Sequence, residues 1–164
     1  MKMHPYKVLF VCTGNSCRSP MAEGILKKLL EKESIEDIVV ESAGTMAPSG
    51  MPPTNFAMLT MVEMGIDISS HQARPLTEDL VKEADLILVM ERVHQHFIEH
   101  FLPSARDKVF LLKTFGKEDV EGNMEIDDPI GGDLDFYRMS GQILKQEIER
   151  ILPLILRMAG HRDR

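Results

Sequence analysis

The sequence predicts an α/β fold: one doubly wound domain over residues 1–164, with a central four-stranded parallel sheet and helices on both faces. Short apolar, β-branched runs alternate with longer segments of helical periodicity, which is the pattern of parallel βαβ units. The chain has the length of one ordinary domain, and no repeat or linker divides it. In such folds, ligands bind at the carboxyl ends of the strands.

The first expected strand is Tyr6–Cys12, a nearly continuous apolar run typical of a strand that a parallel sheet buries on both faces. It ends abruptly at Thr13–Asn15. Ser19 is then placed to cap a helix and Pro20 to occupy its first position. The apolar residues that follow recur at helical spacing and predict this helix: Met21, Ile25, Leu26, Leu29 and Leu30.

The same alternation continues to the end of the chain. We expect three further strands at Ile38–Val40, Asp85–Met90 and Lys108–Leu111. We expect three further helices at Phe56–Met64, His94–Phe101 and about Leu134–Met158. Gly65 is placed to end the first of these helices, and Pro153 should kink or interrupt the last one near its end.

Two irregular segments, Gly44–Thr54 and Thr114–Asp133, are long for loops in a compact domain. The first holds three prolines, and the second holds four glycines and a cluster of acidic residues. Loops of this length are often functional.

Composition excludes several classes of function. No apolar run approaches the roughly 20 residues that span a bilayer, and Met1–Pro5 leads into the first strand without a signal peptide, so we expect no membrane association and no secretion. A net charge of −7 and a pI near 5.4 argue against nucleic acid as a partner. The two cysteines, Cys12 and Cys17, share one segment and fit neither a disulfide framework nor a zinc site. We therefore expect a reducing, cytoplasmic location and no metal or cofactor.

The segment Cys12–Ser19 lies where a strand gives way to a helix, so successive backbone N–H groups and the helix N-terminus can converge on one point. This arrangement predicts a site for phosphate or another oxyanion. The same field should lower the pKa of Cys12 and favour its nucleophilic thiolate. Arg18, six residues later, can bind two phosphate oxygens with its planar guanidinium.

Taken together, Cys12-x5-Arg18 followed by Ser19-Pro20 near the N-terminus resembles the low-molecular-weight protein tyrosine phosphatases. The resemblance extends through the whole chain, and the most telling of its later stretches is Asp127–Pro129 in the long late loop. Three other matching stretches are Glu41–Gly44, Arg74–Thr77 and Ala84–Met90. In that family an Asp-Pro in the late loop supplies the general acid, which implies this role for Asp128. Taken alone, Asp128 would be a turn former before proline, and Cys12 an inert buried thiol.

The resemblance also implies roles for the rest of the loop. Asn15 would hold its shape, and its type suits a left-handed backbone conformation. Ser19 would hydrogen-bond the nucleophilic sulfur and help it leave, alone or together with helix capping. Cys17 would form a protective disulfide with Cys12 under oxidation, and otherwise it is a small packing residue. The phosphate-binding set implied in this way comprises Thr13, Gly14, Asn15, Ser16, Cys17 and Ser19.

His94, His96 and His100 lie two and four residues apart along one expected helix. Such spacing suggests a metal site, but no carboxylate or cysteine pattern completes one. We therefore expect these histidines to form a solvated helix face.

These residues predict a two-step phosphatase without a metal or organic cofactor. The Cys12 thiolate attacks phosphorus while Asp128 protonates the leaving oxygen, and Asp128 then accepts a proton from the water that releases phosphate. Two alternatives are an arsenate reductase, which uses further cysteines in a later segment, and a phosphate-binding module without turnover. The sequence holds no cysteine beyond Cys17, and it keeps Cys12, Arg18 and Asp128 together.

The expected partner is a phosphorylated protein, and two substrate types stay open. Asp128–Gly132 and Asp107–Phe110 resemble bacterial relatives that act on phosphoarginine, which usually carry threonine where this chain has Ser16. Many tyrosine-specific relatives carry a large aliphatic residue at that position, and most of the family has an aromatic residue in place of Ile130. A serine permits phosphoarginine and leaves room for a phenyl ring, and phosphotyrosine ranks first.

Overall fold

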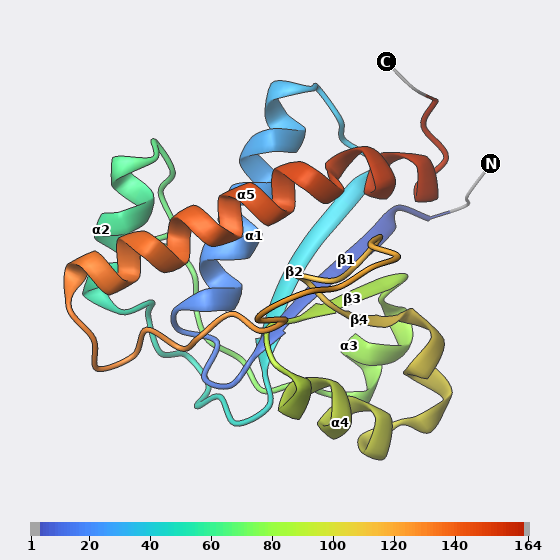
Figure 1. Cartoon of the computed structure of the whole chain (residues 1–164), viewed down its shortest axis with the longest axis horizontal. Helices are drawn as coiled ribbons and strands as arrows, with labels where there is room; N and C mark the ends of the chain where they lie inside the picture. Colours follow the sequence, from blue (N-terminus) through green and yellow to red (C-terminus); the bar gives the residue numbers. More distant parts are fainter. Residues whose placement is uncertain (1–3, 163–164) are drawn as a thin grey trace.

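The computed structural model describes residues 4–162 and confirms the expected α/β fold. The remaining ends of the chain, residues 1–3 and 163–164, lie outside the described residues, so the start of the Met1–Pro5 segment does too. Four parallel strands form one sheet in the order β2-β1-β3-β4 (Figure 1). Their bounds are β1 Tyr6–Cys12, β2 Ile38–Gly44, β3 Leu86–Val89 and β4 Val109–Leu111.

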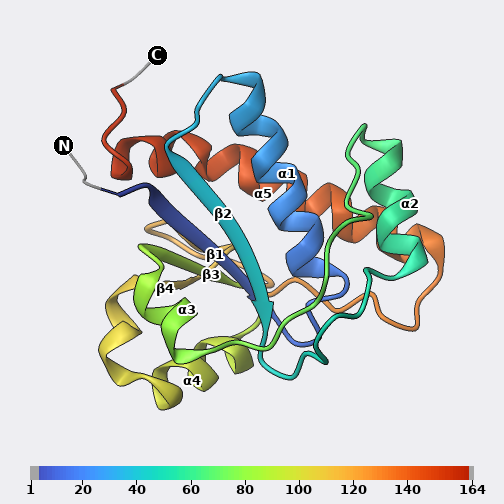
Figure 2. The same ribbon diagram turned by 180° about the vertical axis from the view of Figure 1, so that it is seen from behind.

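Helices cover both faces of this sheet. The long helices α1 and α5 cross on one face, with α2 beside them, while α3 and α4 lie on the other, as Figures 1 and 2 show from opposite sides. The helices are α1 Arg18–Lys32, α2 Asn55–Glu63, α3 Glu78–Glu83, α4 Arg92–Phe101 and α5 Leu134–Met158, and a 3-10 turn, η1, spans Pro103–Lys108.

Strand β1 shows why both faces need a cover. Val8, Phe10 and Cys12 belong to the core under α1 and α5, whereas Leu9 and Val11 belong to the core under α3 and α4. Successive side chains of a strand point to opposite faces, so an apolar run divides itself between two cores.

The first helix begins differently from the expectation. Helix α1 starts at Arg18 with Cys17 at the N-cap position, so Ser19 is not its cap and Pro20 is not its first residue. No side chain caps this helix. The Ser19 hydroxyl is instead engaged with Cys12 and Asn15. The first amides of the helix have no capping side chain, and the backbone N–H of Ser19 points at the sulfur of Cys12.

Pro153 does not interrupt the last helix. Helix α5 continues as one element from Leu134 to Met158 with Pro153 inside it. A proline removes one backbone donor from the ladder. Packing outweighs that loss here, because Ile148, Ile151 and Ile155 are all buried in the core that α5 shares with α1.

Two glycines are required by the local backbone, and the role of the first, Gly65, was expected. Gly65 follows α2 with a positive φ of 76°, which suits the left-handed residue after a helix. Gly44, at the end of β2, has no room for a side chain: a Cβ there would lie 2.4 Å from the carbonyl oxygen of Thr13.

Within residues 4–162, no helix is both long and apolar enough to cross a membrane.

Candidate active site

Three chain segments meet at the carboxyl end of the sheet, where ligands were expected. The loop Cys12–Ser19 follows β1, the loop after β2 runs beside it, and residues 124–130 approach from the far side. The first two are joined by backbone hydrogen bonds from Met46 to Thr13 and from Thr54 to Ser16. The site therefore begins as a backbone framework.

Asn15 shapes the loop Cys12–Ser19, called the phosphate loop from here on, as expected. Its φ of 52° lies in the left-handed region, and its side chain is fully buried. The backbone N–H of Arg74 donates to Asn15 Oδ1 at 3.0 Å, which orients the amide group. Asn15 Nδ2 then donates to Ser19 Oγ at 2.8 Å and to Ser42 Oγ at 3.0 Å.

This orientation leaves the hydrogen of the Ser19 hydroxyl available to the nucleophile. The Ser42 hydroxyl donates to a carboxylate oxygen of Glu23 at 2.6 Å, so its oxygen accepts from Asn15. The Ser19 oxygen likewise accepts from Asn15, and its own hydrogen is left to point at Cys12 Sγ, 2.8 Å away. Toward the thiolate form of Cys12, which has no hydrogen of its own, the Ser19 hydroxyl can only donate, as the resemblance implied.

The sulfur of Cys12 is enclosed and surrounded by donors. Besides the Ser19 hydroxyl, the backbone N–H groups of Asn15 and Ser19 point at it, and the Arg18 charge is close. Burial raises the pKa of the Cys12 thiol, and these four influences lower it. The expected net lowering of this pKa is wrong, because burial is the largest influence.

Arg18 lies under the loop with its guanidinium fully buried. Its Nη1 donates to the carbonyl of Ile126 at 2.7 Å and lies 3.0 Å from Glu91 Oε2, and its Nη2 lies 3.4 Å from Asp128 Oδ2. Its buried Nε has no acceptor among the described residues. An unsatisfied buried N–H is costly, so the arrangement suits an anion that supplies the missing oxygen.

Asp128 reaches the site from the loop before α5, and this loop places it beside Arg18. Its side chain is about one third exposed, and Asp128 Oδ1 accepts the backbone N–H of Ile130 at 3.1 Å. Neighbouring Asp127 is exposed and makes no side-chain hydrogen bond or ion pair within residues 4–162. Asp128 is therefore the better placed of the two carboxylates.

Ser16 and Gly14 line an open groove of about 470 Å³ beside the loop. The rest of its wall is mostly apolar and comes from the loop after β2 and from Ile130: Pro48, Met51, Pro52, Pro53, Thr54, Asn55 and Ile130. Cys17 instead faces the core, where its sulfur lies 3.3 Å from the Tyr137 hydroxyl and 3.5 Å from Thr54 Oγ1. Both cysteines are free.

Two residues of the site were missed from the sequence, Glu91 and His94. Glu91 lies two residues after the end of β3 and pairs with Arg18, and its position after a buried strand was the available signal. His94 is buried, with Nε2 2.9 Å from Thr13 Oγ1, so the expectation of a solvated face is wrong for it. His96 and His100 are exposed as expected. Across the described part of the chain, no three His, Cys, Asp or Glu side chains are grouped as metal ligands.

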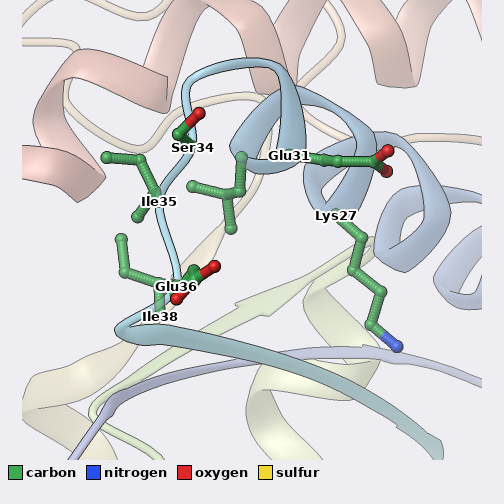
Figure 3. A pocket seen from close by; sticks show the side chains of 7 residues that line it. Lys27, Glu31, Ser34, Ile35, Glu36 and Ile38 are labelled. Carbon is green, nitrogen blue, oxygen red and sulfur yellow. The ribbon is translucent and has the colours of Figure 1, made fainter.

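A second hollow, of about 350 Å³, lies at the far end of α1 (Figure 3). Lys27, Glu31 and Glu36 carry its charges, and Ile35 and Ile38 form an apolar wall. It lies near the amino end of β2, away from Cys12, and no cysteine or histidine lines it. The candidate catalytic residues Cys12, Arg18 and Asp128 all lie at the other end of the sheet.

Residues 7–159 match the family described as low molecular weight phosphotyrosine protein phosphatase. The chain belongs to this family. Members of the family similar to this chain include the protein-arginine-phosphatase of Bacillus subtilis, which is 38% identical over 88% of this chain and 91% of its own length. A probable low molecular weight protein-tyrosine-phosphatase, EpsP of Ralstonia nicotianae, is 35% identical over 90% and 94%.

A solved structure of the same family has the same fold. The low molecular weight protein tyrosine phosphatase of T. tengcongensis superimposes with a TM-score of 0.84 at 39% identity, over 91% of this chain and 99% of that one. The family and the enzyme class that the sequence predicted are thereby confirmed.

Proposed function

We propose that this chain hydrolyses phosphotyrosine on proteins through a phosphate ester of Cys12. One observation carries the proposal: the sulfur of Cys12, three N–H or O–H donors and the buried Arg18 converge on one loop. Phosphate monoesters hydrolyse extremely slowly in water, so a catalyst must stabilise the phosphoryl charge as well as attack. The loop amides and Arg18 meet the first need, and Cys12 meets the second.

In the first step, Cys12 reacts as the thiolate, the form that the Ser19 hydroxyl, the amides of Asn15 and Ser19 and the Arg18 charge favour against burial. Its sulfur forms a bond to phosphorus as the bond from phosphorus to the tyrosyl oxygen breaks. Asp128 gives its proton to the departing oxygen, which leaves as a neutral phenol. Phosphoryl oxygens accept hydrogen bonds from the free amides at the start of α1 and from Arg18, whose Nε has no acceptor in the described chain. Phosphate binding thus extends over Thr13, Gly14, Asn15, Ser16, Cys17 and Ser19.

In the second step, Asp128 takes a proton from water, and the oxygen of that water forms a bond to phosphorus. The bond from sulfur to phosphorus breaks, which releases inorganic phosphate and returns Cys12 to the thiolate. The Ser19 hydroxyl, which donates to the sulfur at 2.8 Å, stabilises the charge that returns to it. Both steps use side chains of this chain and require no metal or organic cofactor.

A specific observation favours phosphoarginine as a second candidate substrate. The hydroxyl side chain of Ser16 lies on the wall of the groove beside the loop. It can accept a hydrogen bond from a guanidinium N–H, whose burial without a partner would cost about 1–3 kcal/mol. The apolar remainder of the wall, including Ile130, fits a phenyl ring at least as well. Phosphotyrosine therefore keeps the first rank.

The remaining expectations belong to the same proposal. The substrate would be a phosphorylated protein, and the enzyme would act in the cytoplasm as one domain of residues 1–164. A reducing compartment suits a nucleophile that has to stay a free thiol, and both cysteines are free in the structure. We infer no arsenate reductase activity, because the sequence has no third cysteine to carry an oxidation forward.

The test is to compare kcat/KM on matched phosphotyrosine and phosphoarginine peptides for the wild type, Cys12→Ser and Ser16→Ile. We expect a preference for phosphotyrosine, no turnover by Cys12→Ser with phosphate affinity retained, and loss of any phosphoarginine activity in Ser16→Ile. A higher kcat/KM on phosphoarginine peptides would make the second candidate correct. Cys12→Ser activity within tenfold of the wild type would exclude Cys12 as the nucleophile.

A further inference from the structure

Helix α4 begins with a capping box whose two members both reach the phosphate loop. Within the box, the Glu91 side chain accepts the backbone N–H of His94, and the His94 ring accepts the backbone N–H of Glu91. Such a box ordinarily serves its own helix. Here Glu91 also lies 3.0 Å from Arg18 Nη1, and His94 Nε2 lies 2.9 Å from Thr13 Oγ1.

The box determines which nitrogen of His94 carries the proton. Nδ1 lies 3.1 Å from the backbone N–H of Glu91, so it accepts. In the neutral ring the hydrogen is then on Nε2, which donates it to the hydroxyl oxygen of Thr13. Burial and the charge of Arg18 lower the pKa of His94 to about 4, so the ring is neutral at physiological pH. The direction of this hydrogen bond is therefore fixed.

We propose that His94 is a positioning residue of the active site, which holds Thr13, and with it the backbone next to Cys12, through a directed hydrogen bond from Nε2. The proposal rests on the proposed function, because it assigns His94 to the same phosphate loop. Thr13 is the residue that follows the nucleophile, and its carbonyl accepts the backbone N–H of Met46. Its side chain supplies a second tether, on the α4 side of the loop.

The same box links this tether to the guanidinium. Glu91 is held in place by the backbone N–H of His94, and it supplies one of the two carboxylates beside Arg18. A shift of the start of α4 would therefore move the supports of Arg18 and Cys12 together. His94 is 1% exposed, whereas His96 and His100 on the same helix are exposed. His94 is therefore not part of the polar surface of α4.

The two functions of the ring can be separated by substitution. His94→Asn keeps an acceptor close to the backbone, near the place of Nδ1, but the asparagine side chain cannot reach Thr13. Gln places an amide N–H near the place of Nε2 and loses the short-range acceptor. Thr13→Val removes the hydroxyl without changing the side-chain volume much, and Thr13→Ser keeps it. His96→Asn, on the exposed side of α4, is the matched control.

The test measures kcat/KM on a phosphotyrosine peptide, affinity for inorganic phosphate, and thermal stability for these variants. We expect His94→Asn and Thr13→Val each to lower kcat/KM by about 3- to 10-fold, the range for the loss of one hydrogen bond. The double variant should lose no more than either single one, because both remove the same contact. His96→Asn, outside the site, should stay within about twofold, whereas Thr13→Ser and His94→Gln should each keep a higher kcat/KM than Thr13→Val and His94→Asn.

Multiplying losses in the double variant would overturn the proposal, since the two residues would then act separately. So would a wild-type rate for Thr13→Val. If His94→Asn does not fold, the comparison of Thr13→Val with Thr13→Ser decides the matter on its own, and equal rates for the two would refute the tether. A wild type without phosphatase activity would instead refute the proposed function, and phosphate affinity would still report on the tether.

Discussion

The phosphate loop and the acid loop carry the two halves of the proposed chemistry, and they are built in opposite ways. In the phosphate loop, residues 12–19, the side chains of Cys12, Asn15, Arg18 and Ser19 are buried and hydrogen-bonded to one another or to the surrounding elements. In the acid loop, residues 114–133, most of the chain is exposed. Phe115 is buried near its start, and the buried side chains of Ile126 and Pro129 lie on either side of Asp128.

This difference follows from what each loop has to do. A site that stabilises phosphoryl charge needs donors held in place before the substrate arrives, because reorganising them would cost free energy in the transition state. A general acid needs a carboxyl group within reach of the leaving oxygen and water nearby for the second step. Asp128, about one third exposed and 3.4 Å from Arg18, meets that description.

The largest expected effect distinguishes the acid loop from the phosphate loop, because it depends on the leaving group of the substrate. Asp128→Ala should lower kcat by about 10²–10⁴-fold on phosphotyrosine, whose leaving oxygen needs a proton, and far less on an aryl phosphate with a good leaving group. Steady-state kinetics on both substrates measures the ratio. Equal losses on the two substrates would point to another acid, with Asp127 the first to be tested.

Acid should lower the free energy of unfolding through His94, which contacts the phosphate loop. The pKa of His94 is about 4 in the folded protein and 6.5 in the unfolded chain, so between these values only the unfolded chain takes up the proton. The free energy of unfolding should be highest above pH 6.5 and fall by up to about 3 kcal/mol as the pH drops to 4. Urea titrations across this range measure the slope, which should decrease in His94→Asn and persist in His96→Asn.

The smallest expected effect on stability comes from one substitution made beside the phosphate loop, at the end of β2, and within the acid loop. Gly44→Ala forces a Cβ against the backbone of Thr13, whereas Gly122 of the acid loop has open space and a positive φ of 78°. Both changes should cost about 1–3 kcal/mol of stability, the first by overpacking and the second by backbone strain. Only Gly44→Ala should also lower kcat/KM, by about 10²-fold, because it displaces the phosphate loop. An equal loss of activity in Gly122→Ala would show that the acid loop is as constrained as the other.

The sequence predicts correctly those structural features whose determining residues lie close together in the chain. The apolar run Tyr6–Cys12 specifies a buried strand, and the loop from Cys12 to Arg18 needs no distant residue to be recognised. Even there, the capping role expected of Ser19 was wrong, because a sulfur brought within 2.8 Å competes for the same hydroxyl. The interruption expected at Pro153 failed for a similar reason, since packing along α5 outweighs one missing donor.

The sequence by itself determined the four strands and the helices α1, α2, α4 and α5, the family, and the identity of the candidate nucleophile, arginine and acid, but it did not predict the short helix α3. Only the tertiary structure decided which distant residues support them. Glu91 and His94 come to Arg18 and Thr13 across more than 70 residues, because parallel pairing of β1 with β3 brings the carboxyl ends of both strands to one edge. The direction of the pKa shift of Cys12 was decided in the same way, since burial depends on everything that packs around the sulfur and on no single motif.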